Sequence, residues 1–362
     1  MRIALVAPLV APIREPQRGG SQAFVSDLAR GLIQRGHEVH LYAASGSDVP
    51  GVQVIDAGVD PDALSATLYR ASGGLPPKPE AAVSAFSRVY SAVGEDRYDL
   101  IHNHAFDAPA ISLATSLAAP VVHTLHLPPG EAVAAALVEA ARGEVPPIVA
   151  GVSAFQAVAW RRIVPVDAIL SPLVPTGAVG WSPAPAGGAV FAGRLSPEKG
   201  AAEAIDIARS AGVEIDVYGD VYDAAYAREQ IEPRGREAGT NVHAAVARSS
   251  LWEAMARAAV VLCPARWDEP FGMVAAEAQA CGTPVVAFNR GAIGEVIVDE
   301  LTGFLVAPED IGAAAGAISR TSELSRAECR AHAERHLDLE RSLDAHEQLY
   351  RRVARPGAGV RG

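Results

Sequence analysis

The sequence lacks an excess of basic residues: its 362 residues include 42 Asp and Glu against 31 Lys and Arg, a formal net charge of −11. Nucleic-acid-binding surfaces and polybasic membrane anchors carry the opposite charge, so both classes are excluded and any anion site must be a local basic pocket. Long apolar runs are also missing. The nearest, residues 132–141, is shorter than the roughly 18 residues of a membrane helix and contains Glu139, so we expect no integral membrane segment.

Cysteine is equally scarce. Cys263, Cys281 and Cys329 are odd in number and far apart, and none belongs to a C-x-x-C pair, so neither a disulfide framework nor a zinc knuckle is indicated. We therefore expect a reducing cytoplasm. The apolar start, residues 1–13, contains two prolines and is followed by no A-x-A cleavage site, which favours a buried strand and loop over a signal peptide. The Ala, Gly, Arg and Pro usage is typical of a bacterial protein.

Short β-rich runs alternate with helical stretches such as residues 22–35 and 80–93, and this rhythm predicts βαβ units and a parallel sheet. The expected strands of the first half are residues 2–7, 38–43, 52–56, 100–103, 120–125 and 148–152. A Pro- and Gly-rich tract at residues 171–188 then breaks the pattern over a length typical of an interdomain linker.

The βα rhythm restarts after this linker, which predicts a second α/β domain of similar size. Its expected strands are residues 189–192, 214–218, 260–263, 284–288 and 303–306. Leucines and charges at helical spacing over residues 336–353 predict a terminal helix. We divide the chain into an N-terminal domain (1–172), a C-terminal domain (173–338) and a terminal helix and tail (339–362) that packs back on the first domain.

Gly19 and Gly20 stand just before the first predicted helix. Two glycines let the backbone approach a ligand closely, and the free N–H groups of a helix start favour a phosphate. A flexible loop ending in Ser21 as a helix N-cap explains the pattern equally well. The G-x-G-x-x-G dinucleotide fingerprint is absent, which counts against a nicotinamide dehydrogenase.

The first strand after the linker runs into Gly193-Arg-Leu-Ser-Pro-Glu-Lys-Gly200. Ser196 has the character of an N-cap and Pro197 of a first helical residue, which places Lys199 in the first helical turn, where the macrodipole disfavours a cation. A bound anion explains Lys199 and the nearby Arg194 better than exposure to water does. We therefore predict a diphosphate site here.

A third cluster, residues 267–278, contains Glu269 in a loop and Glu277 about two turns into the following helix. At 1.5 Å per residue their offset reaches up to about 12 Å, beyond the roughly 5 to 9.5 Å of a glycosidase pair. Hydrolysis by two carboxylates is therefore disfavoured. The spacing suits two parts of one extended ligand, each carboxylate accepting hydrogen bonds from hydroxyls. The apolar neighbours of Glu277 predict its burial.

These motifs, together with Cys281-Gly-Thr-Pro-Val-Val286, residues 291–295 and residues 301–304, resemble the retaining nucleotide-sugar glycosyltransferases of the GT-B fold, often called family 4. The resemblance runs in order and spacing from about residue 190 to 308. It is looser in the N-terminal half, through Gly19-Gly20 and residues 99–104 and 120–126. It implies two Rossmann-like domains that face a cleft, with the acceptor on the N-terminal one and the nucleotide sugar on the C-terminal one.

The resemblance also implies roles for the residues in these motifs. Arg194 and Lys199 would neutralise the donor's diphosphate, Glu277 would bind the ribose and Glu269 the transferred sugar, and His126 would approach the sugar's reacting side. The other implied donor-binding residues are Gly19, Gly20, Gly193, Phe271, Gly272, Met273 and Val274. His102, His104 and His123 are weaker candidates for acceptor contacts; no acidic ligand joins them, so no metal site is indicated.

The implied reaction moves a hexose or N-acetylhexosamine, with retention, from a UDP-linked donor to a hydroxyl or amine of a small-molecule or glycan acceptor. The departing phosphate would help to deprotonate the acceptor, and neither cofactor nor metal is expected. Asp60-Pro-Asp62 matches the D-x-D metal pattern but stands where Asp is a routine N-cap, so we discount it. Two alternatives remain: a nucleotide-sugar epimerase of the same architecture, and a non-catalytic nucleotide-sugar-binding protein.

Overall fold

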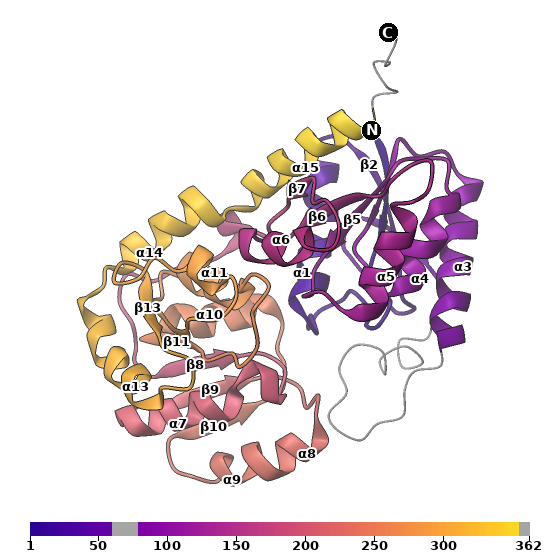
Figure 1. Ribbon diagram of the computed structural model, residues 1–362. Helices are drawn as coiled ribbons and strands as arrows, with labels where there is room; N and C mark the ends of the chain where they lie inside the picture. Colours follow the sequence, from indigo (N-terminus) through magenta and orange to yellow (C-terminus); the bar gives the residue numbers. More distant parts are fainter. Residues whose placement is uncertain (60–78, 355–362) are drawn as a thin grey trace. The chain divides into compact units, whose positions relative to one another are not determined.

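The computed structural model describes residues 1–59 and 79–354, which belong to two compact units (Figure 1). Unit 1 comprises Met1–Arg14, Ser21–Pro172 and Glu340–Gly362, and unit 2 comprises Glu15–Gly20 and Leu173–Leu339. The chain thus leaves unit 1 after Pro172 and returns to it after Leu339. The discounted Asp60-Pro-Asp62 motif lies outside the described residues.

Unit 1 is built on a seven-stranded parallel sheet in the order β3-β2-β1-β4-β5-β6-β7. Its strands are β1 (Arg2–Val6), β2 (Glu38–Ala43), β3 (Gln53–Asp56), β4 (Leu100–Asn103), β5 (Val121–Leu125), β6 (Ile148–Gly151) and β7 (Ala168–Ile169). Its helices include α1 (Gly20–Gln34), α3 (Pro79–Glu95), α4 (Ala108–Ser112), α5 (Glu131–Ala140), α6 (Ala154–Arg161) and α15 (Leu339–Val353). Parallel strands joined through helices bury both faces of a sheet, which explains why β4 is buried throughout and β1 from Ile3 to Val6.

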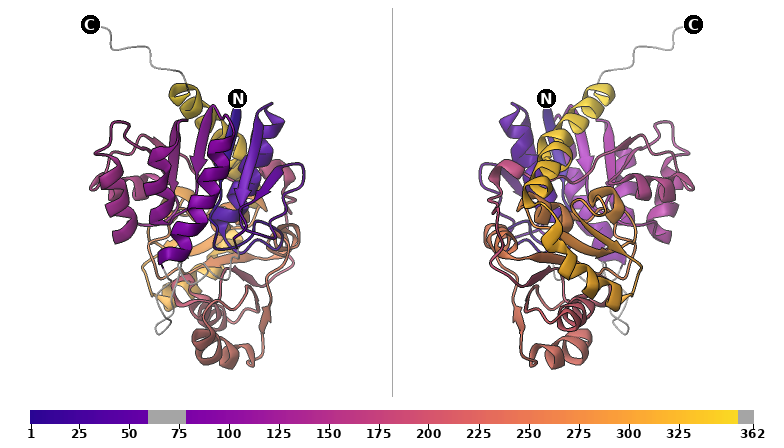
Figure 2. Two further views of the ribbon diagram at one scale, coloured as in Figure 1. Left: turned by 90° about the vertical axis from the view of Figure 1, so that its right-hand side faces the viewer. Right: turned by 90° about the vertical axis from the view of Figure 1, so that its left-hand side faces the viewer.

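The two faces of this sheet are covered by different helices. On one face, Ala4 and Val6 of β1 join Phe86 and Tyr90 of α3 in one apolar cluster. On the other face lies the terminal helix α15, visible in both views of Figure 2 alongside the elements of unit 1. The contact clustering groups residues of this helix from Glu340 onward with unit 1.

Specific contacts hold α15 against unit 1. Arg35 donates to Asp344 (2.8 Å) and to Glu347 (3.3 Å). Gly31 of α1 leaves room for Leu343, since a Cβ at that glycine would lie 2.6 Å from the leucine Cδ1. A glycine on α1 is therefore needed for the close approach of the two helices.

Unit 2 contains a six-stranded parallel sheet in the order β10-β9-β8-β11-β12-β13. Its strands are β8 (Ala189–Ala192), β9 (Ile215–Tyr218), β10 (Thr240–His243), β11 (Val260–Cys263), β12 (Val285–Phe288) and β13 (Gly303–Val306). Its α-helices are α7 (Ala201–Ala211), α8 (Ala224–Tyr226), α9 (Glu232–Gly235), α10 (Arg248–Arg257), α11 (Met273–Ala280), α12 (Ile293–Val296), α13 (Ile311–Arg320) and α14 (Arg326–His332). In both sheets the order of successive strands reverses beside the first strand of the unit. This is the strand order of the doubly wound Rossmann fold.

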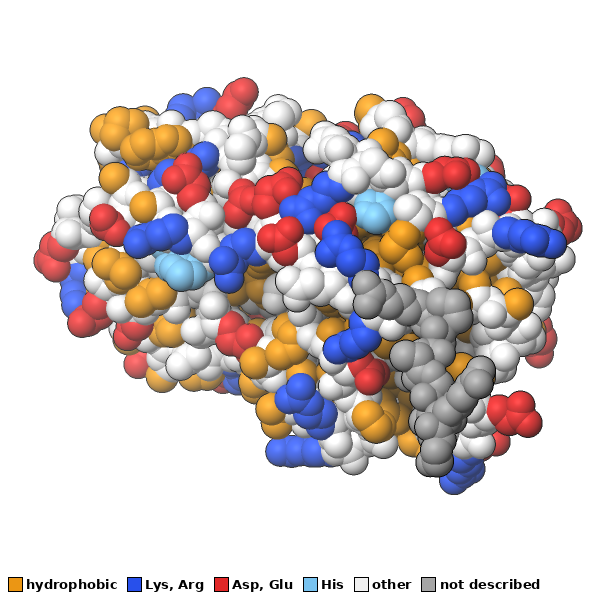
Figure 3. Space-filling view, turned by 90° about the horizontal axis from the view of Figure 1, so that it is seen from above, with side chains coloured by type: hydrophobic (Ala, Val, Ile, Leu, Met, Phe, Trp, Pro, Cys, Tyr) orange, Lys and Arg blue, Asp and Glu red, His pale blue; other side chains and the backbone are white. Residues whose placement is uncertain are grey.

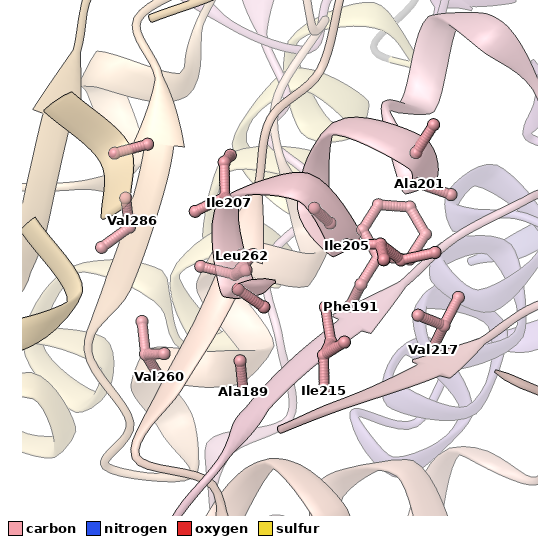
Figure 4. Packing of buried hydrophobic residues seen from close by; sticks show 14 of the residues in the cluster. Ala189, Phe191, Ala201, Ile205, Ile207, Ile215, Val217, Val260, Leu262 and Val286 are labelled. Atoms are coloured by element: carbon pink, nitrogen blue, oxygen red, sulfur yellow. The ribbon is translucent and has the colours of Figure 1, made fainter. Parts of the chain in front are cut away.

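Figure 4 shows the core that fixes the first helix of unit 2 on its sheet: Ile205 and Ala201 of α7 pack over Phe191 of β8 and Val217 of β9. All four side chains are buried. Because this core lies directly below the end of β8, it holds the loop that follows this strand in place.

The predicted strands are all present to within a residue at either end, but two further strands were not predicted. β7 has only two residues, and β10 is the edge strand of its sheet and is half exposed, so neither carries an apolar pattern. The predicted terminal helix also begins later than expected, at Leu339, because residues Ala333–Leu337 form a separate π-helical turn.

Across residues 1–59 and 79–354, no helix has both the length and the apolar character needed to cross a membrane. On the face drawn in Figure 3, basic and acidic side chains of the described residues are interspersed. This surface differs from the continuous basic stripe of a nucleic-acid-binding face.

Candidate active site

Ligands of open parallel sheets bind beyond the carboxyl ends of the strands, where the strand order reverses. In unit 2 this point lies between the neighbouring strands β8 and β11. Arg194 and Lys199 follow β8, and Glu269 follows β11, so the topology brings together residues from two separate sequence motifs. Figure 1 shows β8 and β11 side by side.

The loop after β8 differs from its predicted form. Ser196 and Pro197 begin a short 3-10 turn that ends at Lys199, and α7 starts only at Ala201 after Gly200. The expectation that Lys199 lies in the first turn of the helix is therefore wrong. Gly200 separates the two elements because its φ is +77° and a Cβ there would collide with the carbonyl oxygen of Pro264.

Glu198 and Tyr222 are neighbours that hold Arg194. Its Nη2 donates to Oε1 of Glu198 (3.3 Å), and its guanidinium lies 4.8 Å from the ring centre of Tyr222. Ser196 donates its hydroxyl to the same Glu198 oxygen (2.6 Å). Only 22% of the Arg194 side chain is exposed. The cation is thus preorganised by Glu198 and Tyr222, neither of which the sequence had indicated.

Lys199 and Glu269 are in direct contact. Nζ of Lys199 donates to Oε2 of Glu269 (2.8 Å), and Nε1 of Trp267 donates to the same oxygen (2.8 Å). The ammonium also lies 4.7 Å from the Trp267 ring centre, within the range of a cation–π interaction. Burial raises the pKa of the nearby Cys263 thiol to about 12, so this cysteine stays neutral. Lys199 and Glu269 thus place a fixed cation and a carboxylate side by side.

The segment that carries Glu269 depends on two glycines. Gly272, with a φ of +105°, precedes α11, and a Cβ there would lie 2.7 Å from Cδ1 of Ile293. Gly291 has a φ of +65°, and a Cβ there would collide with the backbone of Glu269, whose carbonyl accepts from the N–H of Ala292 (2.8 Å). Close backbone approach thus fixes the start of α11.

The remaining predicted donor-binding residues of unit 2 stand at the same two loops. Phe271 is buried, whereas Met273 and Val274 in the first turn of α11 are partly exposed. Gly193 directly follows β8, and a Cβ on the neighbouring Gly219 would collide with its carbonyl oxygen. These residues surround the ends of β8 and β11.

Glu277 is buried, as its apolar neighbours predicted, with 5% of the residue exposed. Three donors converge on its Oε1: Nε (3.1 Å) and Nη2 (3.0 Å) of Arg248 and Nε1 of Trp252 (3.2 Å). The Arg248 guanidinium also lies 4.8 Å from the Trp252 ring centre. Sequence reasoning missed both partners, because α10 carries no motif that distinguishes an ion pair from a solvated face.

Gly19 and Gly20 end the Glu15–Gly20 segment that groups with unit 2. A Cβ at Gly20 would lie 3.0 Å from Sδ of Met273, another predicted donor-binding residue. The helix α1 begins at Gly20, one residue before the predicted N-cap.

The histidines of unit 1 form a buried cluster at the ends of β4 and β5. His104 Nδ1 and His126 Nε2 are 3.0 Å apart and share a hydrogen bond. His102 uses Nδ1 with the Tyr350 hydroxyl (2.6 Å) and Nε2 with Thr124 (2.7 Å). The rings of His102 and His104 lie 4.0 Å apart between centres. The terminal helix thus contributes a tyrosine to this cluster.

This burial corrects the weaker part of the site prediction. His102 and His104 have no exposed surface and His123, which pairs with Asn103 (3.1 Å), is 2% exposed. None of the three is accessible to an acceptor in this structure, and their surroundings point to a structural role. Among the described residues no group of three or more His, Cys, Asp or Glu is arranged to hold a metal ion.

These histidines, together with His346 of α15, whose ring centre lies 5.6 Å from that of His102, make the stability of unit 1 depend on pH. Burial lowers the pKa of His126 to about 3, and burial lowers that of His123 and His346 to about 4. The unfolded chain takes up protons below about pH 6.5, whereas the folded rings stay neutral, so stability is complete above pH 6.5 and falls as the pH drops toward 4. The loss is about 1.4 kcal/mol per pH unit for each ring.

We therefore expect thermal unfolding to shift to lower temperature between pH 7.5 and 5.5. His346→Asn should make this dependence shallower, because it removes one of the buried rings that stay neutral in the folded state. A melting temperature that is the same at both pH values would contradict the neutral, buried state of these rings.

Two models of glycosyltransferase families match this chain. The model described as Glycosyl transferases group 1 matches residues 188–336, and the model described as Glycosyltransferase Family 4 matches residues 18–165. A curated relative, the D-inositol 3-phosphate glycosyltransferase of Xylanimonas cellulosilytica, is 28% identical over an alignment of 374 positions that covers 85% of each chain.

Solved structures agree in fold. Sucrose-phosphate synthase from Thermosynechococcus elongatus aligns with a TM-score of 0.75 at 20% identity over 97% of this chain and 98% of the other. Anabaena Alr3699/HepE, solved with UDP and glucose, gives a TM-score of 0.75 at 20% identity over 98% and 100%.

The two doubly wound units have the GT-B fold of these structures, and the matched family models make the chain a glycosyltransferase. The matched models, which between them cover most of the chain, make the assignment specific. The chain belongs to the glycosyltransferases of group 1 and family 4.

Proposed function

We propose that the enzyme transfers a hexose or an N-acetylhexosamine, with retention, from a UDP-linked donor to a hydroxyl or amine of a small-molecule or glycan acceptor. The observation that carries the proposal is the Lys199–Glu269 contact of 2.8 Å at the switch point of unit 2. It puts a cation for a diphosphate next to a carboxylate for sugar hydroxyls. UDP and glucose bound to Anabaena Alr3699/HepE support the same donor class.

In this proposal Arg194 and Lys199 stabilise the negative charge that develops on the departing nucleoside diphosphate. Glu269 binds the transferred sugar and Glu277 binds the ribose. The leaving phosphate takes part in deprotonating the acceptor, so no enzyme nucleophile is required. The roles of Gly20 and His126 stay predictions. A reducing cytoplasmic location is also part of the proposal, supported by three free cysteines.

Turnover of UDP-glucose and UDP-N-acetylglucosamine in the presence of EDTA tests the reaction class. We expect transfer to an acceptor from a panel that includes D-inositol 3-phosphate, with the anomeric configuration retained by NMR, because two protein cations supply the charge that a metal would bring. A donor that is epimerised without any acceptor would favour the epimerase, and activity that EDTA abolishes and Mn²⁺ restores would refute the charge assignment.

The two glutamates are expected to behave differently. Glu277→Gln should raise the donor KM and weaken UDP binding, because the ribose does not change during the reaction. Glu269→Gln should mainly lower kcat and leave UDP binding close to wild type, because only contacts that strengthen in the transition state lower the chemical barrier. Calorimetric titration of UDP separates them. Equal UDP affinities, or a loss confined to Glu269→Gln, would overturn the assignment of ribose to Glu277.

A further inference from the structure

The buried carboxylate of Glu277 is paired with a cation that none of the motifs contains. Arg248 begins α10 and directs both Nε and Nη2 at Oε1 of Glu277, at 3.1 and 3.0 Å. Trp252, one turn further along α10, adds its indole N–H to the same oxygen at 3.2 Å. The side chains of Arg248 and Glu277 are 10% and 7% exposed. This is an ion pair held largely out of water.

Because both side chains are buried, Glu277 depends on Arg248 for the stabilisation of its charge. A carboxylate removed from water is driven toward its neutral form unless a cation or several donors stabilise the charge. Arg248 supplies the cation, and its planar guanidinium is itself fixed by stacking on Trp252 at 4.8 Å. The backbone N–H of Arg248 donates to Glu15 of the Glu15–Gly20 segment of the same unit (3.0 Å). The arginine therefore has little freedom to turn away from Glu277.

The geometry also leaves one carboxylate oxygen available. All three donors address Oε1, and no donor among the described residues bonds to Oε2. In the described part of the chain, Oε2 is not one of the fully buried side-chain oxygens that lack a hydrogen-bond partner. It therefore keeps some contact with solvent. The hydrogen bonds to Oε1 hold the carboxylate in place and leave Oε2 as an acceptor, which suits a ligand with hydroxyl groups.

We propose that Arg248 is a positioning residue of the nucleotide site: it acts through Glu277, fixing Oε1 of that carboxylate and directing Oε2 at the ribose hydroxyls. The inference rests on the proposed function, which assigns the ribose to Glu277. In this assignment Oε1 is committed to side chains of α10, so the ribose hydroxyls meet Oε2.

UDP binding by calorimetry tests the role. Arg248→Met should weaken UDP binding by about 10-fold or more, because it strands a buried charge. Arg248→Lys should recover part of the loss. The matched control Arg257→Met, on the same helix and exposed, should bind UDP like wild type. Trp252→Phe, which keeps the stacked ring and loses only the N–H donor, should cause a smaller loss and is the milder variant should Arg248→Met not fold.

A double-mutant cycle separates action through Glu277 from a direct or general effect. In a Glu277→Gln background, Arg248→Met should change UDP affinity by less than about twofold, and in the single variant the donor KM should rise while kcat changes little. An undiminished loss in the Gln background, or wild-type UDP affinity of Arg248→Met itself, would overturn the proposal. Wild-type protein that binds none of UDP, ADP and GDP would instead refute the proposed function.

Discussion

Replacing Lys199 with alanine is expected to lower kcat with the sugar donor by about 100-fold or more, the usual cost of removing one preorganised group that stabilises transition-state charge. Its ammonium contacts Glu269 at 2.8 Å and lies over Trp267, so it is held in place before the donor arrives. The substitution also removes the counter-ion of Glu269. Steady-state kinetics with saturating UDP-glucose is the measurement.

Arg266→Ala is the matched control. Arg266 is a cation close to the same loops, its side chain is 45% exposed, and it pairs with Glu203 rather than with a predicted donor-binding residue. We expect its kcat to stay within about twofold of wild type, since exposed ion pairs contribute little. Comparable losses in the two variants would mean that general electrostatics, rather than the placement of Lys199, governs the rate.

The second large effect is expected from Gly291→Ala. A methyl group at this position would collide with the backbone nitrogen and carbonyl oxygen of Glu269, and the φ of +65° disfavours any side chain. The left-handed conformation and the overlap together should cost roughly 3 kcal/mol or more of stability. Because the obstacle is the Glu269 backbone, the loop that carries this carboxylate must shift, and turnover should fall as well.

Gly212→Ala separates the two contributions. Gly212 has a similar φ of +69°, but a Cβ there would meet nothing within 4 Å. The cost to its stability should come only from the left-handed backbone conformation, about 1 kcal/mol, and its activity should be kept. Chemical denaturation and donor turnover measured on both variants provide the comparison. If Gly291→Ala is no less stable than Gly212→Ala, the close approach to Glu269 is not as the structure has it.

The fold was largely accessible from the sequence, because buried parallel strands are continuous apolar runs between helices. The strands that were not predicted are those without a buried apolar run in the sequence. β10 is a half-exposed edge strand, and β7 has two residues. The turn at Lys199 was missed for another reason. The close approach of the Pro264 carbonyl oxygen requires a glycine at position 200, and these two residues are 64 positions apart in the sequence.

The site divides in the same way. Residues carried by a motif, such as Arg194 and Glu277, were predicted because spacing alone places them at strand ends or on one helix. Their partners were not, since nothing local distinguishes Arg248 from other arginines on exposed helix faces. The burial of His102 was not foreseen because its partner Tyr350 is 248 residues away and comes from α15. Tertiary pairing of this kind becomes visible only when the strand order is known.

The return of α15 to unit 1 has a consequence for how the protein is made. Unit 1 begins with the first strand, yet Leu343, which fills the space beside Gly31, and Tyr350, which bonds to His102, are among the last described residues to be synthesised. Domains generally fold as units during translation. Unit 2 can complete its sheet before α15 has been translated, whereas the buried histidines of unit 1 stay uncovered until the residues of α15 are available. A gene truncated after residue 339 would leave the first half, not the second, without a finished core.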